Sequence, residues 1–406
     1  MRQLYLAATG QNRGKTTTAL GFLDGFAREG LSIGFMKPVG QRTVEVDGTP
    51  ADEDAILMRS VFGLPDPLRA MSPVHIPRGF TKSYIAGEVV EDLGARIRAA
   101  TGAFAERDVL LVEGTGHAGV GAVIGLSNAV VAAMLGAPAV IVSEGGVGRP
   151  IDEIVLNASL FEAHGVPVAG AIVNKVDLDA QPGIVRTLER GLALHGIPLL
   201  GVLPMRPILS NPTLEMVLEG VHGEPVHPGP DLDAVIGDVA IGAMEPGHML
   251  ERVGPRTLVI VPGDREDVIL TLTTAHLVGP ARAGRPDEAG APAGSARTGR
   301  RVGLKGRPWG GLAPVDGHEG AALGLVLTGG YRPRPAVIDA IRRADLFATL
   351  VADDTYRVAS EIHDLLVKTH PADREKIELI KGLVAEFLDV DRILSAATGA
   401  GSGAGP

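Results

Sequence analysis

The residues best suited to chemistry are Gly14-Lys15-Thr16, which combine a glycine, a cation and a hydroxyl. They lie between an apolar segment at 4–8 and a helical pattern at 15–29. In that order, strand then loop then helix, the loop amides and the positive end of the helix converge on one point, where a polyphosphate can bind. Lys15 would then neutralise the terminal phosphates, and the Thr16 hydroxyl would hold Mg²⁺.

The loop departs from the pattern G-x-x-x-x-G-K-[ST] at its first position, because Thr9 stands where glycine is usual and Gly10 follows it. The alternative interpretation is an ordinary strand-to-helix turn that contains Gly-Lys-Thr. In this context we favour a nucleotide loop. The residues expected to line it are Thr9, Gly10, Asn12, Gly14, Lys15, Thr16 and Thr17.

Lys37 follows a short apolar strand expected at 33–36. The next residue is Pro38, which keeps Lys37 out of helical geometry and leaves it at the carboxyl end of the strand. In open α/β sheets ligands bind at that edge, so Lys37 can reach the same site as Lys15. The alternative is a surface lysine after a strand.

Two acidic residues are candidates for the metal. Asp54 precedes a helical pattern at 55–62, where a carboxylate either caps the helix or binds Mg²⁺ opposite Thr16. Glu113 ends an apolar run that suits a strand buried on both faces, the position of metal-contacting acids in nucleotide sites. The alternative for Glu113 is a structural role at a strand end.

A possible base contact follows a strand expected at 168–173, where the chain reads Asn174-Lys175-Val176-Asp177. A strand followed by N-K-x-D is the base-reading sequence of GTP-binding proteins, in which the acid pairs with guanine. Asn174 alone would instead suit adenine, and a plain turn is the third interpretation. We therefore include Asn174 and Asp177 among the nucleotide-binding candidates.

The composition excludes several classes of protein. The chain has 406 residues, 45% hydrophobic and 21% charged, with no cysteine and a net charge of −10. The charge disfavours nucleic acid and anionic membranes as partners, and the lack of cysteine excludes disulfides, thiolate zinc sites and a cysteine nucleophile. We expect no signal peptide and no membrane span, and a cytoplasmic protein.

Together these motifs resemble the dethiobiotin synthetase family over about residues 1–205. The resemblance implies a P-loop ATPase fold of the α/β class, a mainly parallel sheet flanked by helices. It implies Mg²⁺ ligands at Thr16, Asp54 and Glu113, and catalytic phosphate contacts at Lys15 and Lys37. It also implies a base contact at Asn174. The matching stretches are Thr9-Gly10, Gly14-Lys15-Thr16, Met36-Lys37-Pro38-Val39, Asp54-Ala55, Leu111-Val112-Glu113-Gly114 and Asn174.

Two related families of P-loop proteins are excluded because this chain lacks a residue that each of them requires. Glutamine-dependent cobyrinate synthases need a cysteine nucleophile, and this chain has no cysteine. Partitioning ATPases carry an extra lysine at the position of Gly10.

From about residue 206 the resemblance changes. Short strands are expected at 235–241, 257–261 and 325–328, in a smaller α/β domain. Two motifs within it, Gly263-Asp264-Arg265-Glu266-Asp267 and Thr328-Gly329-Gly330, resemble the DRTGG domain. The combination resembles the N-terminal part of long bacterial phosphotransacetylases. No phosphotransacetylase catalytic domain is recognised, so acetyl transfer to phosphate is not expected.

The DRTGG motifs have two interpretations. In the first, Asp264 and Arg265 form an ion pair that shapes a turn. In the second, a further anion or nucleotide site uses the amides of the two glycines and the guanidinium fork. The residues of that possible second site are Asp264, Arg265, Thr328, Gly329 and Gly330.

The expected domains are a P-loop domain at 1–205, a DRTGG-like domain at 206–394 and a flexible tail at 395–406. An insertion at 279–320 is rich in Gly, Pro, Ala and Arg and is expected to be largely disordered.

We expect an ATPase or ATP-dependent ligase or phosphoryl-transfer enzyme that uses Mg²⁺ and ATP, with GTP as the other candidate nucleotide. The alternative is a non-catalytic, nucleotide-sensing regulatory protein. The expected partners are the nucleotide, a small acidic metabolite and further copies of the chain in a dimer or larger homo-oligomer.

Overall fold

The computed structural model describes residues 1–278, 322–363, 365, 369–371 and 373–398. The insertion expected at 279–320 lies outside the described residues, as does the expected tail beyond residue 398. The chain divides into two compact units. The first holds Met1–Met205 and the segment that starts at Thr369, and the second starts at Arg206.

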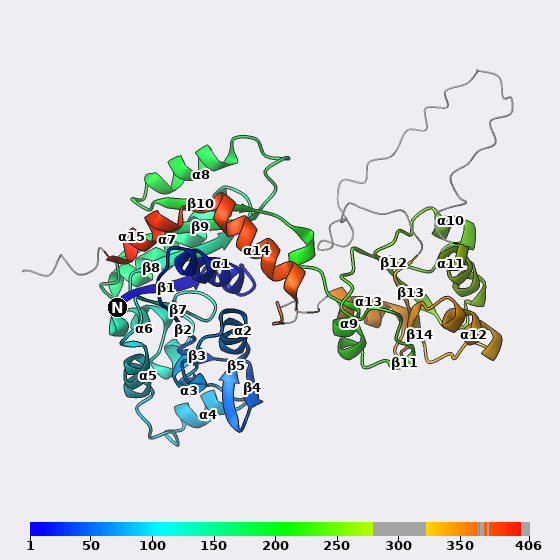
Figure 1. Cartoon of the computed structure of the whole chain (residues 1–406), viewed down its shortest axis with the longest axis horizontal. Helices are drawn as coiled ribbons and strands as arrows, with labels where there is room; N and C mark the ends of the chain where they lie inside the picture. The colour runs from blue at the N-terminus through cyan, green and yellow to red at the C-terminus, as the bar shows by residue number, and fades with distance from the viewer. Residues whose placement is uncertain (279–321, 364, 366–368, 372, 399–406) are drawn as a thin grey trace, which may run out of the picture. The chain divides into compact units, whose positions relative to one another are not determined.

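The first unit is built on a six-stranded sheet in which every neighbouring pair is parallel (Figure 1). The strand order is β10-β9-β8-β1-β7-β2. Strands β2 and β7 lie on one side of β1, and the later strands β8, β9 and β10 lie on the other side. The chain therefore changes direction across the sheet at β1, and in open α/β sheets ligands bind at the loop that follows such a switch point. The strands are β1 (Arg2–Ala8), β2 (Ile33–Met36), β7 (Val109–Glu113), β8 (Ala139–Glu144), β9 (Val168–Val176) and β10 (Leu199–Pro204).

Helices flank this sheet. Helix α1 buries Leu20, Phe22, Leu23 and Phe26, the apolar side of the helical pattern that follows the loop. The unit also has two small two-stranded sheets, one formed by β3 (Val39–Gly40) with β6 (Val74–His75) and one by β4 (Thr43–Val46) with β5 (Thr49–Asp52). The first eight helices are α1 (Lys15–Arg28), α2 (Glu53–Phe62), α3 (Leu68–Met71), α4 (Phe80–Ile85), α5 (Leu93–Thr101), α6 (Asn128–Leu135), α7 (Gly148–Ala163) and α8 (Ile184–Ala193).

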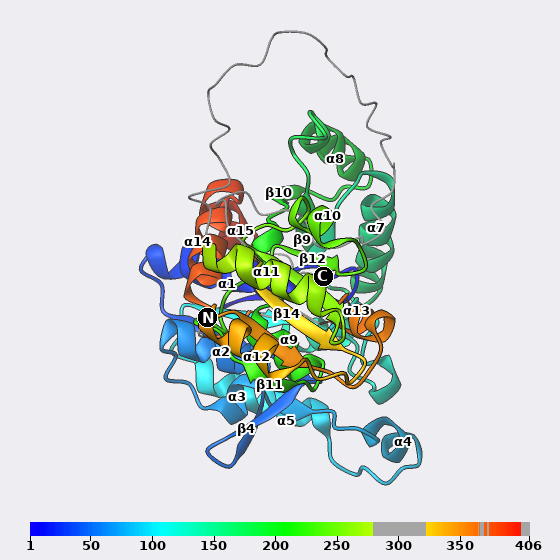
Figure 2. The same ribbon diagram turned by 90° about the vertical axis from the view of Figure 1, so that its right-hand side faces the viewer.

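Two C-terminal helices return to the first unit. Helix α14 (Arg374–Phe387) packs along α1, and α15 (Val390–Thr398) contacts β1, β9 and α1 (Figures 1 and 2). The close approach depends on glycine in α1, because a Cβ on Gly21 would lie 2.2 Å from Val384 Cγ2. The expected boundary of the second domain at residue 394 therefore differs from the structure, in which the described residues from 369 to 398 belong to the first unit. Residues 395–398, expected in the tail, are helical in α15.

The second unit is a five-stranded sheet of order β11-β15-β14-β13-β12. All pairs are parallel except β11 with β15. Alternate residues of each strand enter two cores: Val259 packs with α10, α11 and α12 residues, whereas Leu258 packs with α9 and α13 residues. The elements are β11 (Glu224–His227), β12 (Asp238–Ile241), β13 (Thr257–Pro262), β14 (Gly324–Thr328), β15 (Phe347–Leu350), α9 (Leu214–Gly220), α10 (Pro246–Leu250), α11 (Glu266–Val278), α12 (Pro335–Arg343) and α13 (Thr355–His363).

The expected fold class is confirmed: a parallel sheet flanked by helices is followed by a smaller α/β unit. Two elements differ from the sequence prediction. The strand expected at 235–241 begins only at Asp238, and Asn174, expected just beyond a strand, lies inside β9.

Candidate functional site

The loop between β1 and α1 has a shape that requires glycine at position 14. Gly14 has φ of 95° and is the N-cap of α1. A Cβ at this position would lie 1.9 Å from Asn174 Nδ2, so no other residue fits without displacing that side chain. Lys15 begins the helix, is buried, and donates a hydrogen bond of 3.3 Å from Nζ to Gly10 O. The Lys15 ammonium therefore lies back against its own loop.

Thr16, in the first turn of α1, faces two carboxylates from other elements. Its Oγ1 lies 3.1 Å from Glu113 Oε1 at the end of β7 and 3.3 Å from Asp54 Oδ1 at the start of α2. A hydroxyl has one proton, so it donates to one carboxylate at a time. The start of α2 is fixed by Asp52, whose Oδ1 accepts from Asp54 N at 3.1 Å. Asp52 is thus the cap, which leaves the Asp54 side chain directed to the site.

Lys37 joins this group from the end of β2. Its Nζ donates to Asp54 Oδ2 at 2.7 Å, to Glu113 Oε1 at 2.9 Å and to Gly114 O at 3.4 Å. Three acceptors satisfy the three protons of an ammonium. The structure therefore brings together Thr16, Lys37, Asp54 and Glu113, which are far apart in the sequence.

Burial and charge oppose one another in this cluster. Burial acts to lower the pKa of Lys37, but the nearby Asp54 and Glu113 carboxylates outweigh it and raise that pKa, so Lys37 stays charged. Burial raises the pKa of Glu113, and Lys37 only partly offsets the effect. Glu113 Oε2 is buried and has no hydrogen-bond partner among the described residues. A buried acceptor without a partner is costly, and a cation bound there would satisfy it.

The donor set fits a hard divalent ion. Two carboxylates and a hydroxyl are oxygen ligands of the kind that Mg²⁺ takes, together with water and phosphate oxygens. In the described part of the chain, no three His, Asp or Glu side chains form a group that could hold a metal by themselves. The residues present therefore suit an ion shared with a phosphate ligand better than a metal held by protein alone.

The glycine-rich loop after β7 is positioned by Asn128, a residue that sequence reasoning missed. Asn128 Nδ2 donates to Thr115 O at 2.8 Å and to His117 O at 2.7 Å. Its Oδ1 accepts from Thr115 N at 3.1 Å and from Tyr5 OH at 2.8 Å. Asn128 follows a Ser N-cap in an apolar helix, and no sequence signal separates it from an ordinary first-turn residue.

The other flank of the phosphate loop is held by β8 and β9. Asn174 Nδ2 donates to Arg13 O at 3.1 Å, and Lys175 Nζ donates to Asn12 O at 2.8 Å. Glu144, at the end of β8, pairs with both Arg13 and Lys175. Arg13, Glu144 and Lys175 were not predicted as site residues.

The remaining loop candidates make fewer contacts. Thr9 Oγ1 lies 3.1 Å from Ser143 Oγ, and Asn12 has a left-handed φ of 57°. Thr17 is half-buried in the first turn of α1. Asp177 is exposed beyond β9, away from the buried cluster of Lys37, Asp54 and Glu113.

Comparison with known proteins agrees with this geometry. A family model described as an AAA domain matches residues 2–213, more than half of the chain. The chain belongs to this AAA-domain family. A second model, the DRTGG domain, matches residues 216–365. The predicted pairing of a dethiobiotin synthetase-like P-loop domain with a DRTGG domain is thereby confirmed.

The curated relatives include phosphate acetyltransferases. The chain is 25% identical over 399 residues to that of Nitratidesulfovibrio vulgaris, covering 95% of this chain and 50% of the relative. It is 26% identical over 408 residues to that of Pseudomonas putida, covering 96% of this chain and 51% of the relative. The AAA-domain chain thus spans about half the length of the curated relatives it matches.

Solved structures resemble it weakly. The cell division ATPase MinD of Pyrococcus furiosus is 16% identical, with a TM-score of 0.33, over 52% of this chain and 86% of that one. The CBS and DRTGG domains of the Clostridium perfringens pyrophosphatase regulatory region, solved with the activator diadenosine tetraphosphate, are 15% identical, with a TM-score of 0.25, over 40% of this chain and 49% of that one. Scores this low support no argument about what this chain binds.

In the DRTGG domain the two sequence motifs meet at the ends of neighbouring strands, where Gly263 N donates to Thr328 O at 3.0 Å. The amides expected to bind an anion have other partners: Gly329 N donates to Asp353 O at 2.8 Å and Gly330 N to Val351 O at 2.9 Å. These two amides therefore close the loop onto its neighbour, and the second interpretation of the motifs stays a prediction.

Of the charged residues in the motifs, Arg265 forms an ion pair and Asp264 is exposed. Arg265 donates two hydrogen bonds to the Asp267 carboxylate, from Nε at 2.9 Å and from Nη2 at 3.0 Å. The expected partner, Asp264, is exposed and does not form this pair. Thr328 Oγ1 lies 2.7 Å from Thr355 Oγ1. The contacts therefore agree with the turn-shaping interpretation, with a different acid.

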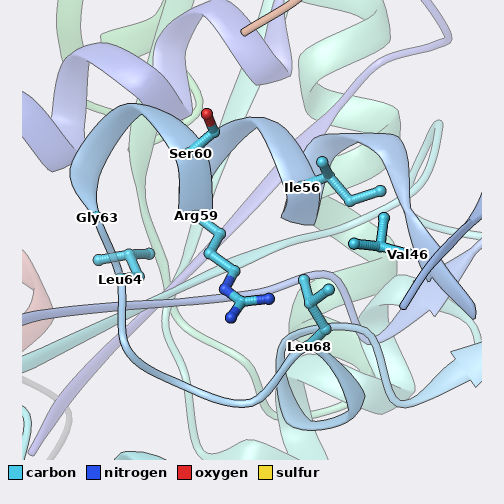
Figure 3. A pocket seen from close by; sticks show the side chains of 7 residues that line it. All are labelled: Val46, Ile56, Arg59, Ser60, Gly63, Leu64 and Leu68. Atoms are coloured by element: carbon cyan, nitrogen blue, oxygen red, sulfur yellow. The ribbon is translucent and has the colours of Figure 1, made fainter. Parts of the chain in front are cut away.

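An apolar hollow of about 390 Å³ lies beside α2, with Val46 of β4 in its lining (Figure 3). The Arg59 side chain extends from α2 toward Leu68 across it. None of the sequence-predicted site residues lines this hollow, so it is separate from the phosphate loop. Its lining is Val46, Ile56, Arg59, Ser60, Gly63, Leu64 and Leu68.

Among the described residues, no helix has the length and apolar character needed to cross a membrane.

Proposed function

We propose that the first unit binds a nucleoside triphosphate with Mg²⁺ and transfers its terminal phosphoryl group. One observation carries this proposal: Thr16, Lys37, Asp54 and Glu113 converge at the carboxyl ends of the neighbouring strands β1, β7 and β2, at the loop that carries Lys15. Convergence of cations, a hydroxyl and acids at a phosphate loop is the arrangement that phosphoryl transfer needs.

Each residue has a distinct role in this proposal. The loop amides and Lys15 would bind the β- and γ-phosphates, because amides at a helix start and a lysine at its first position are the groups that bind phosphate in such loops, and Lys15 Nζ lies 3.3 Å from Gly10 O of this loop. Thr16, Asp54 and Glu113 would hold Mg²⁺, which when bound neutralises charge on the phosphate oxygens. The orphaned Glu113 Oε2 supports this assignment, since an ion would give it a partner.

Lys37 is the second cation of the site. Its raised pKa keeps it protonated at neutral pH, so it offers a fixed positive charge. In the free protein this charge is matched by Asp54 and Glu113. Lys37 would stabilise charge on the transferred phosphoryl group, the kind of electrostatic stabilisation that contributes most to such reactions. The acceptor in this proposal is a small carboxylate or carbamate.

A nucleotide-sensing regulatory role is the second candidate. The observation that favours it is the DRTGG domain that follows, together with relatives in which this chain corresponds to about half of a phosphate acetyltransferase. In that case turnover is slow, and a small acidic metabolite binds elsewhere on the chain. The homo-oligomer and the cytoplasmic location stay predictions.

Phosphate release from ATP and GTP tests the proposal, with Mg²⁺ and a panel of small carboxylates and amines. Thr16→Val keeps the side-chain shape and removes the hydroxyl that faces Asp54 and Glu113. We expect Mg²⁺-dependent phosphate release by the wild type and a loss of at least about tenfold in the variant. If the wild type binds nucleotide but releases no phosphate with any of these carboxylates or amines, the nucleotide-sensing role is favoured. Equal turnover by the variant would contradict the assigned roles.

A further inference from the structure

The carboxyl end of β9 is fastened to the phosphate loop by two adjacent side chains. Asn174 Nδ2 bonds Arg13 O, Lys175 Nζ bonds Asn12 O, and Asn174 Oδ1 accepts from Lys175 N at 2.9 Å. Three hydrogen bonds hold these groups in fixed relation. Whatever ligand lies in the loop therefore has the end of β9 beside it.

The opposite flank of the loop is occupied by charged side chains. There Lys37, Asp54 and Glu113 form a buried cluster linked by contacts of 2.7 and 2.9 Å. The end of β9, which bonds the loop at Arg13 O and Asn12 O, is the side on which we place the base of a nucleotide whose phosphates lie in the loop.

The backbone turns at the end of β9. Lys175 has a left-handed φ of 56°, and its ammonium lies 3.1 Å from Glu144 Oε2 as well as bonding the loop. With the ammonium tethered, the methylene stem is held at the strand end, where it offers an apolar surface to a planar ring.

Asp177 follows two residues later and is exposed. Its Oδ1 accepts from Ala180 N at 3.0 Å, and within the described residues Oδ2 accepts no hydrogen bond. An ionised carboxylate has about four acceptor positions and no donor. Asp177 can therefore keep its turn contact and still accept two hydrogen bonds from a ligand.

We propose that the base bound at this site is guanine and that Asp177 is the specificity-determining residue. The inference rests on the proposed nucleotide site. Guanine carries two adjacent donors on one edge, N1–H and the exocyclic amino group, which match the two oxygens of a carboxylate. Adenine has an unprotonated N1 and a C–H on the same edge, so Asp177 would face an acceptor with no proton between them.

Asn174 does not discriminate between guanine and adenine. Its amide retains one proton and one lone pair after its two contacts, and N7 of either purine can accept that proton. Discrimination therefore falls to Asp177, and a bidentate contact of this kind separates bases by roughly tenfold or more.

Calorimetric titration of the full chain with GTP, ATP and xanthosine triphosphate in Mg²⁺ tests the inference, using the wild type, Asp177→Asn and Asp179→Asn. Asp177→Asn keeps an oxygen for Ala180 N, so the turn is retained, but it replaces one acceptor with a donor. That amide matches xanthine, which carries N1–H beside a carbonyl oxygen. Asp179 is the matched control, an exposed carboxylate in the same turn.

The wild type and Asp179→Asn should bind GTP at least about tenfold more tightly than ATP. Asp177→Asn should lose this preference and bind xanthosine triphosphate more tightly than GTP. Equal affinity for ATP and GTP in the wild type, or an unchanged preference in Asp177→Asn, overturns the inference and leaves the nucleotide site standing. Failure of both nucleotides to bind overturns the nucleotide site itself.

Discussion

Lys37 Nζ lies 2.7 Å from Asp54 Oδ2, and both side chains are buried. The ion pair joins the end of β2 to the start of α2, and Glu113 completes it from β7. A buried charge left without its partner is strongly destabilising.

Lys37→Met should therefore lower the free energy of unfolding by about 3–5 kcal/mol, because two buried carboxylates lose their counter-charge. Urea denaturation at neutral pH measures the loss. Adding Glu113→Gln to this variant should recover part of it, since one uncompensated charge is removed. A Lys37→Met protein as stable as the wild type would show that the ammonium does not hold these carboxylates.

The raised pKa of Glu113 predicts opposite pH effects on stability and on metal binding. A carboxyl whose pKa is higher in the folded than in the unfolded chain stabilises at low pH. That contribution is lost as pH rises from its ordinary value of 4.5 through the raised value. Mg²⁺ competes with the same proton, so its affinity should increase over this window.

Melting temperatures measured as the pH is raised from 4.5, with and without Mg²⁺, test this linkage. Glu113→Gln retains an acceptor for Lys37 and Thr16 but has no proton to lose, so both slopes should flatten. If the variant keeps the wild-type pH dependence of Mg²⁺ stabilisation, Glu113 is not the group whose protonation competes with Mg²⁺.

Substitution of Asn128 should lower the free energy of unfolding more than substitution of Tyr5, because Asn128 holds the loop after β7. Asn128→Asp keeps the acceptor for Tyr5 OH and Thr115 N but turns an oxygen toward Thr115 O and His117 O. Losing two buried donors should cost roughly 2–6 kcal/mol, at about 1–3 kcal/mol each.

Tyr5→Phe is the comparison for this change, because it removes one hydroxyl and leaves Asn128 Oδ1 bonded to Thr115 N. It should cost only about 0.5–1.5 kcal/mol in the same denaturation experiment. Equal losses in the two variants would mean that the amide donors do not fix the loop.

The packing of α14 on α1 gives a matched pair of glycine substitutions. Gly21→Ala would bring a Cβ within 2.2 Å of Val384 Cγ2, and overpacking of this kind costs about 1–3 kcal/mol. Gly382→Ala, within α14, meets no atom within 4 Å and should stabilise by about 0.4–1 kcal/mol. Opposite shifts in melting temperature are expected, and a stabilising Gly21→Ala would contradict the close helix contact.

Much of the first unit follows from local sequence. The apolar runs that became β1, β2 and β7 are buried on both faces, so each reads as a strand without its neighbours. Lys37 and Glu113 could be placed because both follow such runs, and parallel strands end at one edge.

Other features depend on tertiary contacts that a single sequence does not encode locally. The helical pattern of α14 is visible, but its packing on α1 depends on Gly21, more than 350 positions earlier. The amides of Gly329 and Gly330 look available in sequence, and only the fold shows that Asp353 O and Val351 O use them. Asn128 likewise gains its role from the loop after β7 and from Tyr5 in β1.

The central claim is that Lys15 and its loop bind the phosphates of a nucleotide. Calorimetric titration with GTP and ATP, in the presence and absence of Mg²⁺, tests it most directly when applied to the wild type, Lys15→Ala and Lys82→Ala. Lys82 is an exposed lysine on α4 and serves as the control. The account predicts Mg²⁺-dependent binding by the wild type and Lys82→Ala and its loss in Lys15→Ala. Binding of equal affinity in all three proteins would contradict it.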